Sequence, residues 1–210
     1  QREKETTHPP IVPTPPPCAH DRLRAMPLPA LPGRSDSLVP LAHPHLPAAP
    51  VRALLEGRAD LADRLAVIEI DPELADTEAL MAAYGIPASG SGNCVVISGS
   101  RAGEERVAAC VVGADTRADV NNLAKRRLDV RKASFHPMDR AVTESGMEYG
   151  GITPVGLPPS WRLFIDARLL DQEVVVIGSG LRRSKLLVPG SALADLPQAE
   201  IVTDLGRPIS

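Results

Sequence analysis

Two glycine-rich segments hold the residues of this sequence that could bind a ligand through the backbone. Residues 146–158 carry four glycines and two prolines between two apolar runs. A second glycine turn, Gly178-Ser-Gly180, ends an apolar run and leads to Arg182, Arg183 and Lys185. Glycine allows torsions and close approaches that a Cβ forbids, and proline fixes φ. The two loops suit a small polar ligand with a phosphate chain, and ordinary turns between strands are the alternative.

The common nucleotide and nucleophile motifs are incomplete or absent. Gly178-x-Gly180 follows an apolar run as in a dinucleotide fingerprint, but Arg183 stands where the third glycine belongs. The patterns G-x-x-x-x-G-K-[ST] and G-x-S-x-G do not occur. His136 is the one histidine outside the proline-rich segment, and its place before Pro137 predicts a cap or surface residue rather than a catalytic base. We therefore expect no serine triad, no metal site and no cofactor.

Composition separates a tail from a folded domain. The chain has 210 residues, of which 43% are hydrophobic and only 2% aromatic, so Val, Leu, Ile and Ala must build the core. Thirteen of the 22 prolines lie in residues 1–50, a segment without a helical or strand period. We predict a proline-rich flexible leader over residues 1–37, His43-Pro-His45 as a loop, and one folded domain over residues 38–210.

The cysteines and the apolar runs indicate the compartment. No apolar run approaches the roughly 18 residues that a membrane span needs. The charged start, Gln1-Arg-Glu-Lys-Glu5, does not resemble a signal peptide. Cys18, Cys94 and Cys110 are odd in number and lack a C-x-x-C pair, which predicts reduced thiols, with the last two buried in strands. We expect a cytoplasmic protein with no membrane partner.

Charge is distributed unevenly although the net charge is only −3. Residues 51–80 hold eight acids against three arginines. Residues 117–140 hold seven bases against three aspartates, so 7 − 3 gives +4 there. A basic patch of this kind favours a polyanion partner, and a solvated helix face is the alternative.

Hydrophobic periodicity and turn residues predict alternating helices and strands. We expect helices at residues 51–55, 77–84, 120–128, 137–145 and 192–196. The expected strands are residues 65–70, 94–98, 106–112, 163–165, 174–177, 186–188 and 200–202, with residues 99–105 as a hairpin loop. Asp76 is the expected cap of the second helix, and Thr116-x-x-Asp119 has the spacing of a capping box for the third. The predicted fold class is α+β, a single domain with a mixed β-sheet, hairpins and surrounding helices.

Several segments, in order, resemble the YbaK/prolyl-tRNA-synthetase-associated domain family. The similarity extends from about residue 65 to residue 205. It includes residues 107–112, the helix with Asp119-Val-Asn121 and Lys125, and residues 130–135, 143–156 and 176–185. Gly150-Gly-Ile-Thr-Pro154 matches the family's G-x-x-x-P loop, and Gly178-Ser-Gly180 matches its second glycine loop.

The resemblance implies an aminoacyl-tRNA deacylase that edits in trans, with mischarged tRNA as substrate and an aminoacyl-tRNA synthetase as a further candidate partner. In the family, the glycine loops shape a pocket for small mischarged side chains, while backbone amides and a ribose hydroxyl orient water. It implies catalytic roles for Asn93, Gly150 and Gly151. The implied substrate-binding residues are Tyr149, Ile152, Thr153, Pro154, Gly156, Gly178, Ser179 and Gly180. The implied tRNA-binding residues are Lys125, Arg126, Arg127, Arg131, Lys132, Arg182, Arg183 and Lys185.

Asn93 stands where the family usually has a lysine that contacts the substrate's 3′ nucleotide. Asparagine can hydrogen-bond a phosphate or carbonyl but brings no charge. Lys125, Lys132 or Lys185 could replace that lysine, Asn93 could serve another substrate, or Asn93 could be a turn residue. The predicted function is a trans-editing deacylase. The alternatives are a catalytically weak tRNA-binding or tRNA-sensing module and a small-molecule hydrolase.

Three further residues near the predicted pocket have expected structural or ligand-binding roles. Tyr149 could stack on the terminal adenine or fill the core, where aromatics are scarce. Trp161, after two prolines, is expected to anchor a loop rather than contact a ligand. Asp166 ends a predicted strand, and we expect it to cap the following turn.

Overall fold

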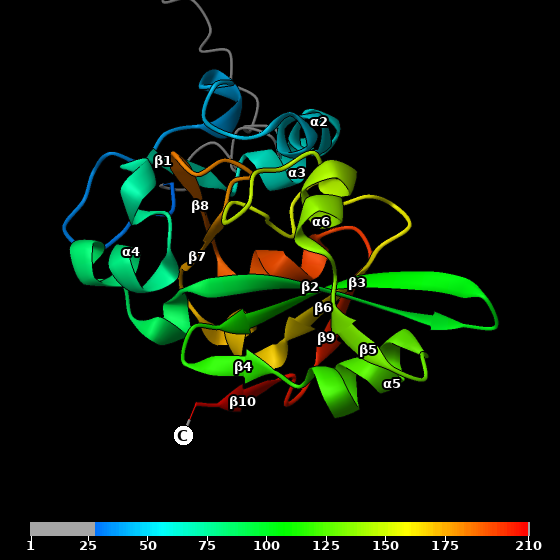
Figure 1. The fold of residues 1–210 in the computed structure, drawn as a ribbon. Helices are drawn as coiled ribbons and strands as arrows, with labels where there is room; N and C mark the ends of the chain where they lie inside the picture. The colour runs from blue at the N-terminus through cyan, green and yellow to red at the C-terminus, as the bar shows by residue number, and fades with distance from the viewer. Residues whose placement is uncertain (1–27, 210) are drawn as a thin grey trace, which may run out of the picture.

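Two sheets form the framework of the protein in the computed structural model, which describes residues 28–209 (Figure 1). The five-stranded sheet has the order β5-β2-β3-β6-β9; its β2–β3 pair is antiparallel, and β6 runs parallel to both β3 and β9. The three-stranded sheet β1-β8-β7 is antiparallel, and β10 pairs with β4. The strands are β1 Ala66–Glu69, β2 Gly92–Arg101, β3 Glu104–Gly113, β4 Thr116–Ala118, β5 Ala133–Phe135, β6 Arg162–Asp166, β7 Val175–Gly178, β8 Ser184–Val188, β9 Ala199–Val202 and β10 Gly206–Pro208.

Short helices cover the sheets. The α-helices are α2 Ala49–Gly57, α3 Ala59–Ala62, α4 Thr77–Tyr84, α5 Lys125–Leu128 and α6 Met138–Ser145. A π-helical turn, Val120–Ala124, leads directly into α5, and 3₁₀ turns include Ala167–Asp171 and Gly190–Asp195. The mixed sheet with surrounding helices confirms the predicted α+β fold class. No helix in the described residues is both long and apolar enough to cross a membrane.

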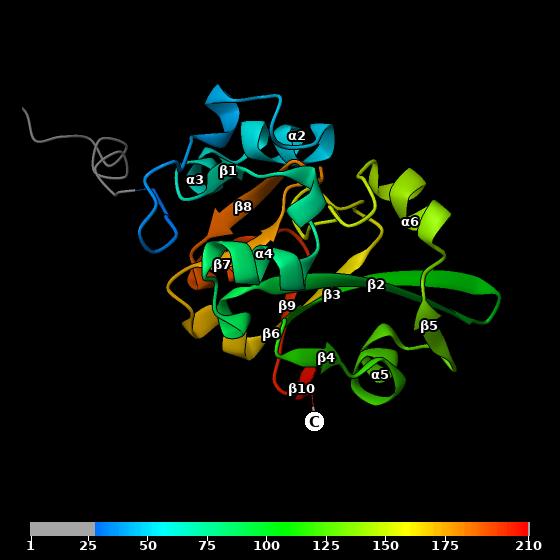
Figure 2. The same ribbon diagram turned by 60° about the vertical axis from the view of Figure 1, so that its left-hand side comes forward.

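The main hydrophobic core lies between the two sheets. Alternate strand residues point to opposite faces, so Val175 and Ile177 enter this core while Val176 packs on the other side, beneath α4. The five-stranded sheet contributes Val111 and Ile165 from its facing side. On its far side, α5 packs Leu128 against a second cluster. Figure 2 shows α4 and α6 on one side of β2 and α5 on the other.

Several helix boundaries follow from local sequence signals as predicted. Helix α2 ends at Gly57, and α4 ends where Gly85 takes the left-handed conformation at φ 65°. Asp76 is the N-cap residue of α4, although its side chain makes no capping hydrogen bond. Pro137 is the N-cap of α6.

The predicted capping box at Thr116 is wrong. Thr116 belongs to β4, which pairs with β10, and its hydroxyl donates to the Gly113 carbonyl oxygen at 2.8 Å. Asp119 alone caps the following π-helical turn, since its carboxylate accepts from the Asn122 amide. A pairing partner about 90 residues away in the chain overrides the local capping signal.

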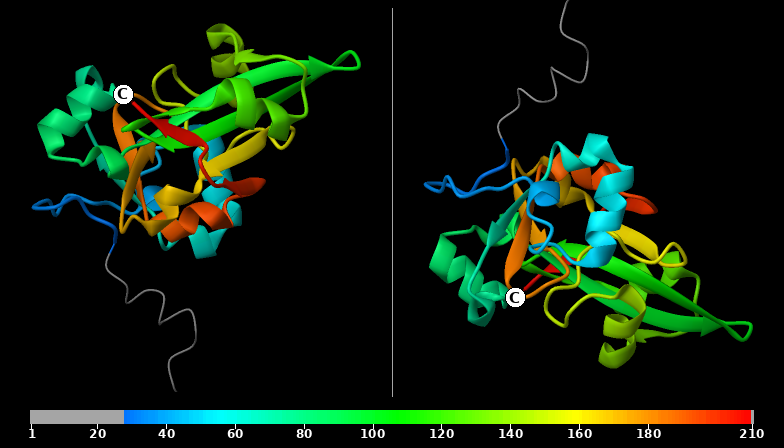
Figure 3. Two further views of the ribbon diagram at one scale, coloured as in Figure 1. Left: turned by 90° about the horizontal axis from the view of Figure 1, so that it is seen from below. Right: turned by 90° about the horizontal axis from the view of Figure 1, so that it is seen from above.

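The strand predictions fall short at the hairpin and at the sheet edges. The β2–β3 pairing continues to Arg101 and Glu104, so only two residues form the turn instead of the predicted seven. The tip of this hairpin projects from the rest of the molecule (Figure 3). The three-residue strands β4, β5 and β10 were not predicted, because such short segments show no periodicity.

The predicted leader lies mainly outside the described residues, as does Cys18. Of its last ten residues, Leu31 is only 5% exposed and packs in the cluster under α4. Leu38 forms a β-bridge with Val67 and packs against the main core. Packing therefore begins before residue 38. His43 and His45 lie in a loop, as predicted.

Candidate functional site

The two glycine segments meet in space and are joined by hydrogen bonds. The Gly180 amide donates to the Gly151 carbonyl oxygen at 2.8 Å, and the Glu148 amide donates to the Gly180 carbonyl oxygen at 2.9 Å. The Arg182 amide donates to the Glu148 carboxylate at 2.7 Å. These bonds fix the loop before β8 against the loop after α6.

Close backbone approach explains why glycine occupies both loops. A Cβ on Gly178 would lie 2.3 Å from the Gly151 carbonyl oxygen, and one on Gly151 would lie 2.9 Å from the Leu181 amide nitrogen. Gly150 and Gly180 have φ values of 78° and 84°, which side chains rarely adopt. The loops can therefore touch only where side chains are absent.

A cleft of about 510 Å³ opens beside this junction. Its walls come from both glycine loops, the beginning of β2, the turn before α4, and the segment from β5 into α6. The lining residues are Ala75, Asp76, Thr77, Gly92, Asn93, Cys94, Val95, Val96, Phe135, His136, Met138, Ala141, Tyr149, Gly150, Ile152, Gly178 and Lys185. The volume lies within the range of small-molecule sites, roughly 300–1,000 Å³.

Polar donors gather at one end of the cleft. The Thr77 hydroxyl donates to Asn93 Oδ1 at 2.6 Å, which leaves the Asn93 amide N–H groups available to a ligand. Lys185 is 6% exposed, and its ammonium donates to the Ala75 carbonyl oxygen at 2.8 Å. Desolvation lowers the pKa of Lys185, partly offset by the nearby Asp76 carboxylate. The sequence predicted Lys185 as a tRNA contact or as a replacement for the family lysine, and in the structure Lys185 lines the cleft.

Three large apolar side chains surround the cleft mouth. Phe135, Met138 and Tyr149 are 70%, 57% and 63% exposed, and all three line the cleft. Tyr149 is therefore not a core residue. Exposed aromatic rings beside a polar cavity offer a stacking surface for a planar ligand group.

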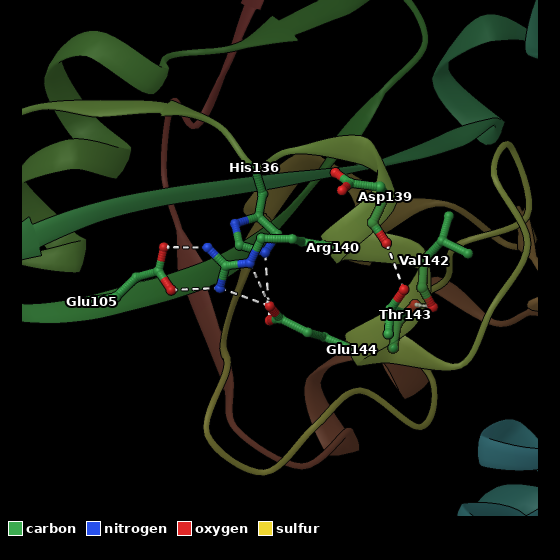
Figure 4. Close-up of polar contacts among 8 residues, drawn as sticks. Glu105, His136, Asp139, Arg140, Val142, Thr143 and Glu144 are labelled. Carbon is green, nitrogen blue, oxygen red and sulfur yellow. Dashed lines mark hydrogen bonds and ion pairs between the residues drawn. The ribbon is translucent and has the colours of Figure 1, made fainter.

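Helix α6 is tied to the hairpin by the ion pairs of Arg140, beside the His136 ring (Figure 4). Arg140 donates to both Glu105 carboxylate oxygens at 2.8 and 2.6 Å and to Glu144 at 2.9 Å. Hydrogen bonding from Arg140 lowers the pKa of Glu105. Glu144 Oε2 also lies 3.4 Å from His136 Nε2. The network holds one wall of the cleft.

The structure corrects the expectation that His136 is a cap or surface residue. Its side chain is fully buried, and its ring packs edge-on against Trp161 with centroids 5.8 Å apart. Pro137 is the cap residue of α6. Trp161 is 3% exposed, as expected for a loop anchor.

Cys110 is buried, as predicted, whereas Cys94 is only partly buried and lines the cleft. Burial raises the pKa of Cys94 to about 12, and burial likewise raises the pKa of Cys110 to about 12. Cys94 lines the cleft, but a thiol is a much weaker nucleophile than a thiolate. Within residues 28–209, no three His, Cys, Asp or Glu side chains form a metal-ligating group.

The predicted catalytic and substrate-binding residues divide into those that line the cleft and those that do not. Asn93, Tyr149, Gly150, Ile152 and Gly178 line the cleft. The others do not line the cleft: Gly151, Thr153, Pro154, Gly156, Ser179 and Gly180.

Among the residues that do not line the cleft, Gly151, Ser179 and Gly180 make hydrogen bonds that hold the loops. The Gly151 amide donates to the Glu148 carbonyl oxygen at 2.9 Å. Thr153 and Ser179 are fully buried, and the Ser179 hydroxyl lies 2.7 Å from that of Ser184.

The predicted tRNA-binding cations lie in three places. Lys125, Arg126 and Arg127 belong to α5, on the side of the sheet opposite α4 and α6. Arg131 and Lys132 are exposed and precede β5, whose last residue lines the cleft. Arg182 and Arg183 each donate to a backbone carbonyl, those of Pro72 and His45.

Sequence reasoning did not identify Thr77, Phe135 or Met138 as site residues. Thr77 is the first residue of α4, and Phe135 and Met138 lie on either side of His136-Pro137, where β5 passes into α6. The sequence offered one signal for Phe135, the rarity of aromatic residues at 2% of the chain. The structure shows that this ring is exposed.

Comparison with known proteins gives a family and a fold. A family model described as an aminoacyl-tRNA editing domain matches residues 71–196. No curated protein matches the chain. A solved structure titled a putative trans-editing enzyme for prolyl tRNA synthetase is 21% identical, with a TM-score of 0.64, and the match covers 75% of this chain and 95% of the other. The structure of hypothetical protein APE2540 is 22% identical, with a TM-score of 0.65 and coverage of 75% and 99%.

Proposed function

Because the chain belongs to the aminoacyl-tRNA editing domain family, we propose that it is a trans-editing deacylase for a mischarged aminoacyl-tRNA. In the reaction, water adds to the ester carbonyl carbon and the bond from that carbon to the ribose oxygen breaks. One proton ends on the ribose oxygen, and the amino acid leaves as a carboxylate with release of the other proton.

The observation that carries this proposal is the cleft at the glycine-loop junction. Its polar end offers the Asn93 amide and the Lys185 ammonium, and its mouth offers the Phe135 and Tyr149 rings. An aminoacyl-adenosine end has a matching layout, with an ester and ribose at one end and a planar base at the other. The 510 Å³ volume supports entry of such a group.

The chemistry at the cleft favours attack by water over a covalent enzyme intermediate. The cleft-lining thiol of Cys94 stays protonated because its pKa is raised to about 12. Hydrogen-bond donors aimed at a developing oxyanion contribute roughly 3–4 kcal/mol each in known hydrolases. Fixed donors in a partly buried cleft can therefore supply much of the catalysis.

A panel of charged tRNAs tests the proposal. The full chain is incubated with alanyl-, cysteinyl- and seryl-tRNA for proline, and with correctly charged prolyl-tRNA; tRNA for proline comes first because of the described function of the structural relative. We expect release of a small mischarged amino acid above the rate without enzyme and little release of proline. Asn93→Ala should reduce this rate, whereas Arg34→Ala, on the surface beside Asp36, is the control.

A tRNA-binding module without turnover is the main rival, because Asn93 brings no charge. Tight, salt-sensitive binding of tRNA with no hydrolysis of any substrate would contradict the deacylase proposal and support this rival. Hydrolysis of small esters that is unaffected by tRNA would instead indicate a small-molecule hydrolase.

A further inference from the structure

Lys185 is a buried cation beside the cleft. It lies in β8 directly across from Gly178 of β7, and both residues line the cleft. Only 6% of Lys185 is exposed. Lysine is rarely buried to this degree unless it is paired with an acceptor or a negative charge, so a buried Lys185 indicates such a partner.

The protein supplies Lys185 with little hydrogen bonding. Within residues 28–209, its ammonium has one hydrogen-bond acceptor, the Ala75 carbonyl oxygen at 2.8 Å. An ammonium group has three N–H donors, so two stay available to a ligand. The nearby charged groups are Asp76, at the N-cap of α4, and Arg182, in the loop before β8. The Asp76 side chain is 77% exposed, and its carboxylate lies 3.9 Å from the Arg182 guanidinium. Solvent and Arg182 therefore weaken the attraction between Asp76 and Lys185.

The cleft therefore has an end that presents donors. The Thr77 hydroxyl donates to Asn93 Oδ1, which orients the Asn93 amide so that its N–H groups remain for a ligand. Together with Lys185, this arrangement suits a ligand oxygen that carries or develops negative charge. A hydrolysed ester has such an atom, its carbonyl oxygen.

We propose that Lys185 is a catalytic residue whose ammonium hydrogen-bonds the ester carbonyl oxygen and stabilises the negative charge that forms there when water attacks. The inference rests on the proposed deacylase function. Lys185 stays protonated throughout: it transfers no proton, and the charge on the oxygen returns to the carbonyl when the carbon–ribose oxygen bond breaks.

The test compares Lys185→Met, which keeps the length and apolar stem, with Lys185→Arg, which keeps the charge. We expect Lys185→Met to lower kcat at least about 100-fold with a smaller change in KM, and Lys185→Arg to retain more activity. Arg64→Met is the matched control, because it removes a surface cation paired with Asp195 at 2.5 Å. A Lys185 that only supports the fold would give a lower Tm and an unchanged kcat for the folded fraction.

A binding measurement separates failure of this inference from failure of the proposed function. The probe is 3′-deoxy-3′-(L-alanylamino)adenosine, which has an amide carbonyl and cannot be hydrolysed as an ester. We expect wild type to bind it at least about tenfold more tightly than Lys185→Met does. Ester hydrolysis that is equal in wild type and Lys185→Met would overturn the inference and leave the deacylase proposal standing.

Absence of hydrolysis has two readings that the same probe separates. If wild type hydrolyses nothing but binds the probe through Lys185, the carbonyl contact stands and the deacylase proposal fails. If wild type neither hydrolyses any ester nor binds the probe more tightly than Lys185→Met, both are overturned.

Discussion

Asp166 and Lys185 are both charged residues buried in strands, but the protein satisfies them very differently. Asp166 ends β6, and its side chain is 1% exposed. Its two oxygens accept four hydrogen bonds, three from Arg168 and one from the Gly206 amide. Lys185 has one protein acceptor within the described residues.

The pKa directions follow from this difference. Desolvation raises the pKa of Asp166, but the hydrogen bonds from Arg168 and Gly206 outweigh it, so the pKa is lowered overall. Desolvation dominates at Lys185 and lowers its pKa. A buried charge with a full set of partners stabilises the fold, whereas one with few partners beside a cleft is a candidate for chemistry.

Asp166→Ala should give the largest effect, on stability. Removal of the carboxylate leaves the buried Gly206 amide without its acceptor, which costs roughly 1–3 kcal/mol. Loss of the cap at the Arg168 amide adds roughly 1 kcal/mol, whereas the half-exposed Arg168 guanidinium can turn to solvent. Urea unfolding measures the loss, and the folded fraction should keep its hydrolytic rate. A selective loss of kcat with normal stability would break the comparison by giving Asp166 a role in chemistry.

The acid limb of the stability curve gives a second check on Asp166. Because its folded pKa is below its unfolded value near 3.9, the stability that it contributes is complete above that pH and is lost as pH falls through the folded pKa. Asp166→Ala should therefore show a shallower loss of stability below about pH 4.

Gly178→Ala should destabilise the loop junction by about 1–3 kcal/mol, because the new Cβ meets the Gly151 carbonyl oxygen. Hydrolysis should fall as well, since Gly178 lines the cleft. Gly57→Ala is the control: a Cβ there meets nothing within 4 Å, and we expect unchanged or slightly higher stability. Equal Tm values for the two variants would contradict the close-contact interpretation.

The pH dependence of hydrolysis should depend on Lys185. Its ammonium form is lost as pH rises through a pKa below 10.5, so the rate above the spontaneous background should decline on the alkaline side. Lys185→Arg should move this decline upward, since arginine stays charged. An alkaline profile that is identical in both proteins would assign the decline to another group.

Thr77→Val should lower kcat/KM by about tenfold or less. The hydroxyl orients the Asn93 amide at 2.6 Å, and a net hydrogen bond contributes about 0.5–1.5 kcal/mol. The two side chains have similar shapes, so Tm should change little. Thr143→Val is a matched control, because its hydroxyl donates only to the Asp139 carbonyl oxygen within α6. Equal hydrolysis rates for Thr77→Val and Thr143→Val would contradict a role of Thr77 in orienting Asn93 for the reaction.

The surface cations extend the comparison and should give the smallest effects. Arg183 donates a hydrogen bond to the His45 carbonyl oxygen, so we expect Arg183→Ala to lower Tm and to leave the tRNA affinity nearly unchanged. Arg131 and Lys132 are exposed near β5, so Arg131→Ala/Lys132→Ala should weaken tRNA binding and flatten its salt dependence. Filter binding at several salt concentrations measures the tRNA affinity and thermal unfolding measures Tm, and the reverse pattern would contradict the assignment of these residues.

Much of the fold could be predicted because its signals are local. Gly85 ends α4 in the left-handed conformation, α2 ends at Gly57, and the apolar runs around residues 94–98 and 106–112 form the central hairpin. Strands β4 and β10 could not be predicted, because each is three residues long and exists through its partner. Thr116 was misassigned for this reason. Of the predicted site residues, Gly178 and Asn93 line the cleft whereas Gly156 and Ser179 do not, because the lining depends on how the loops pack in space.

The sequence by itself determined the two glycine loops, the absence of complete nucleotide-binding and nucleophile-elbow motifs, and the family resemblance. Glycine at Gly151 and Gly178 reflects a steric requirement that residue type records directly. Only the tertiary structure decided that Lys185 is buried beside the Ala75 carbonyl and Thr77 holds Asn93. Those placements depend on β8, β2 and the turn before α4, which lie far apart in the chain and meet only when the two sheets pack together.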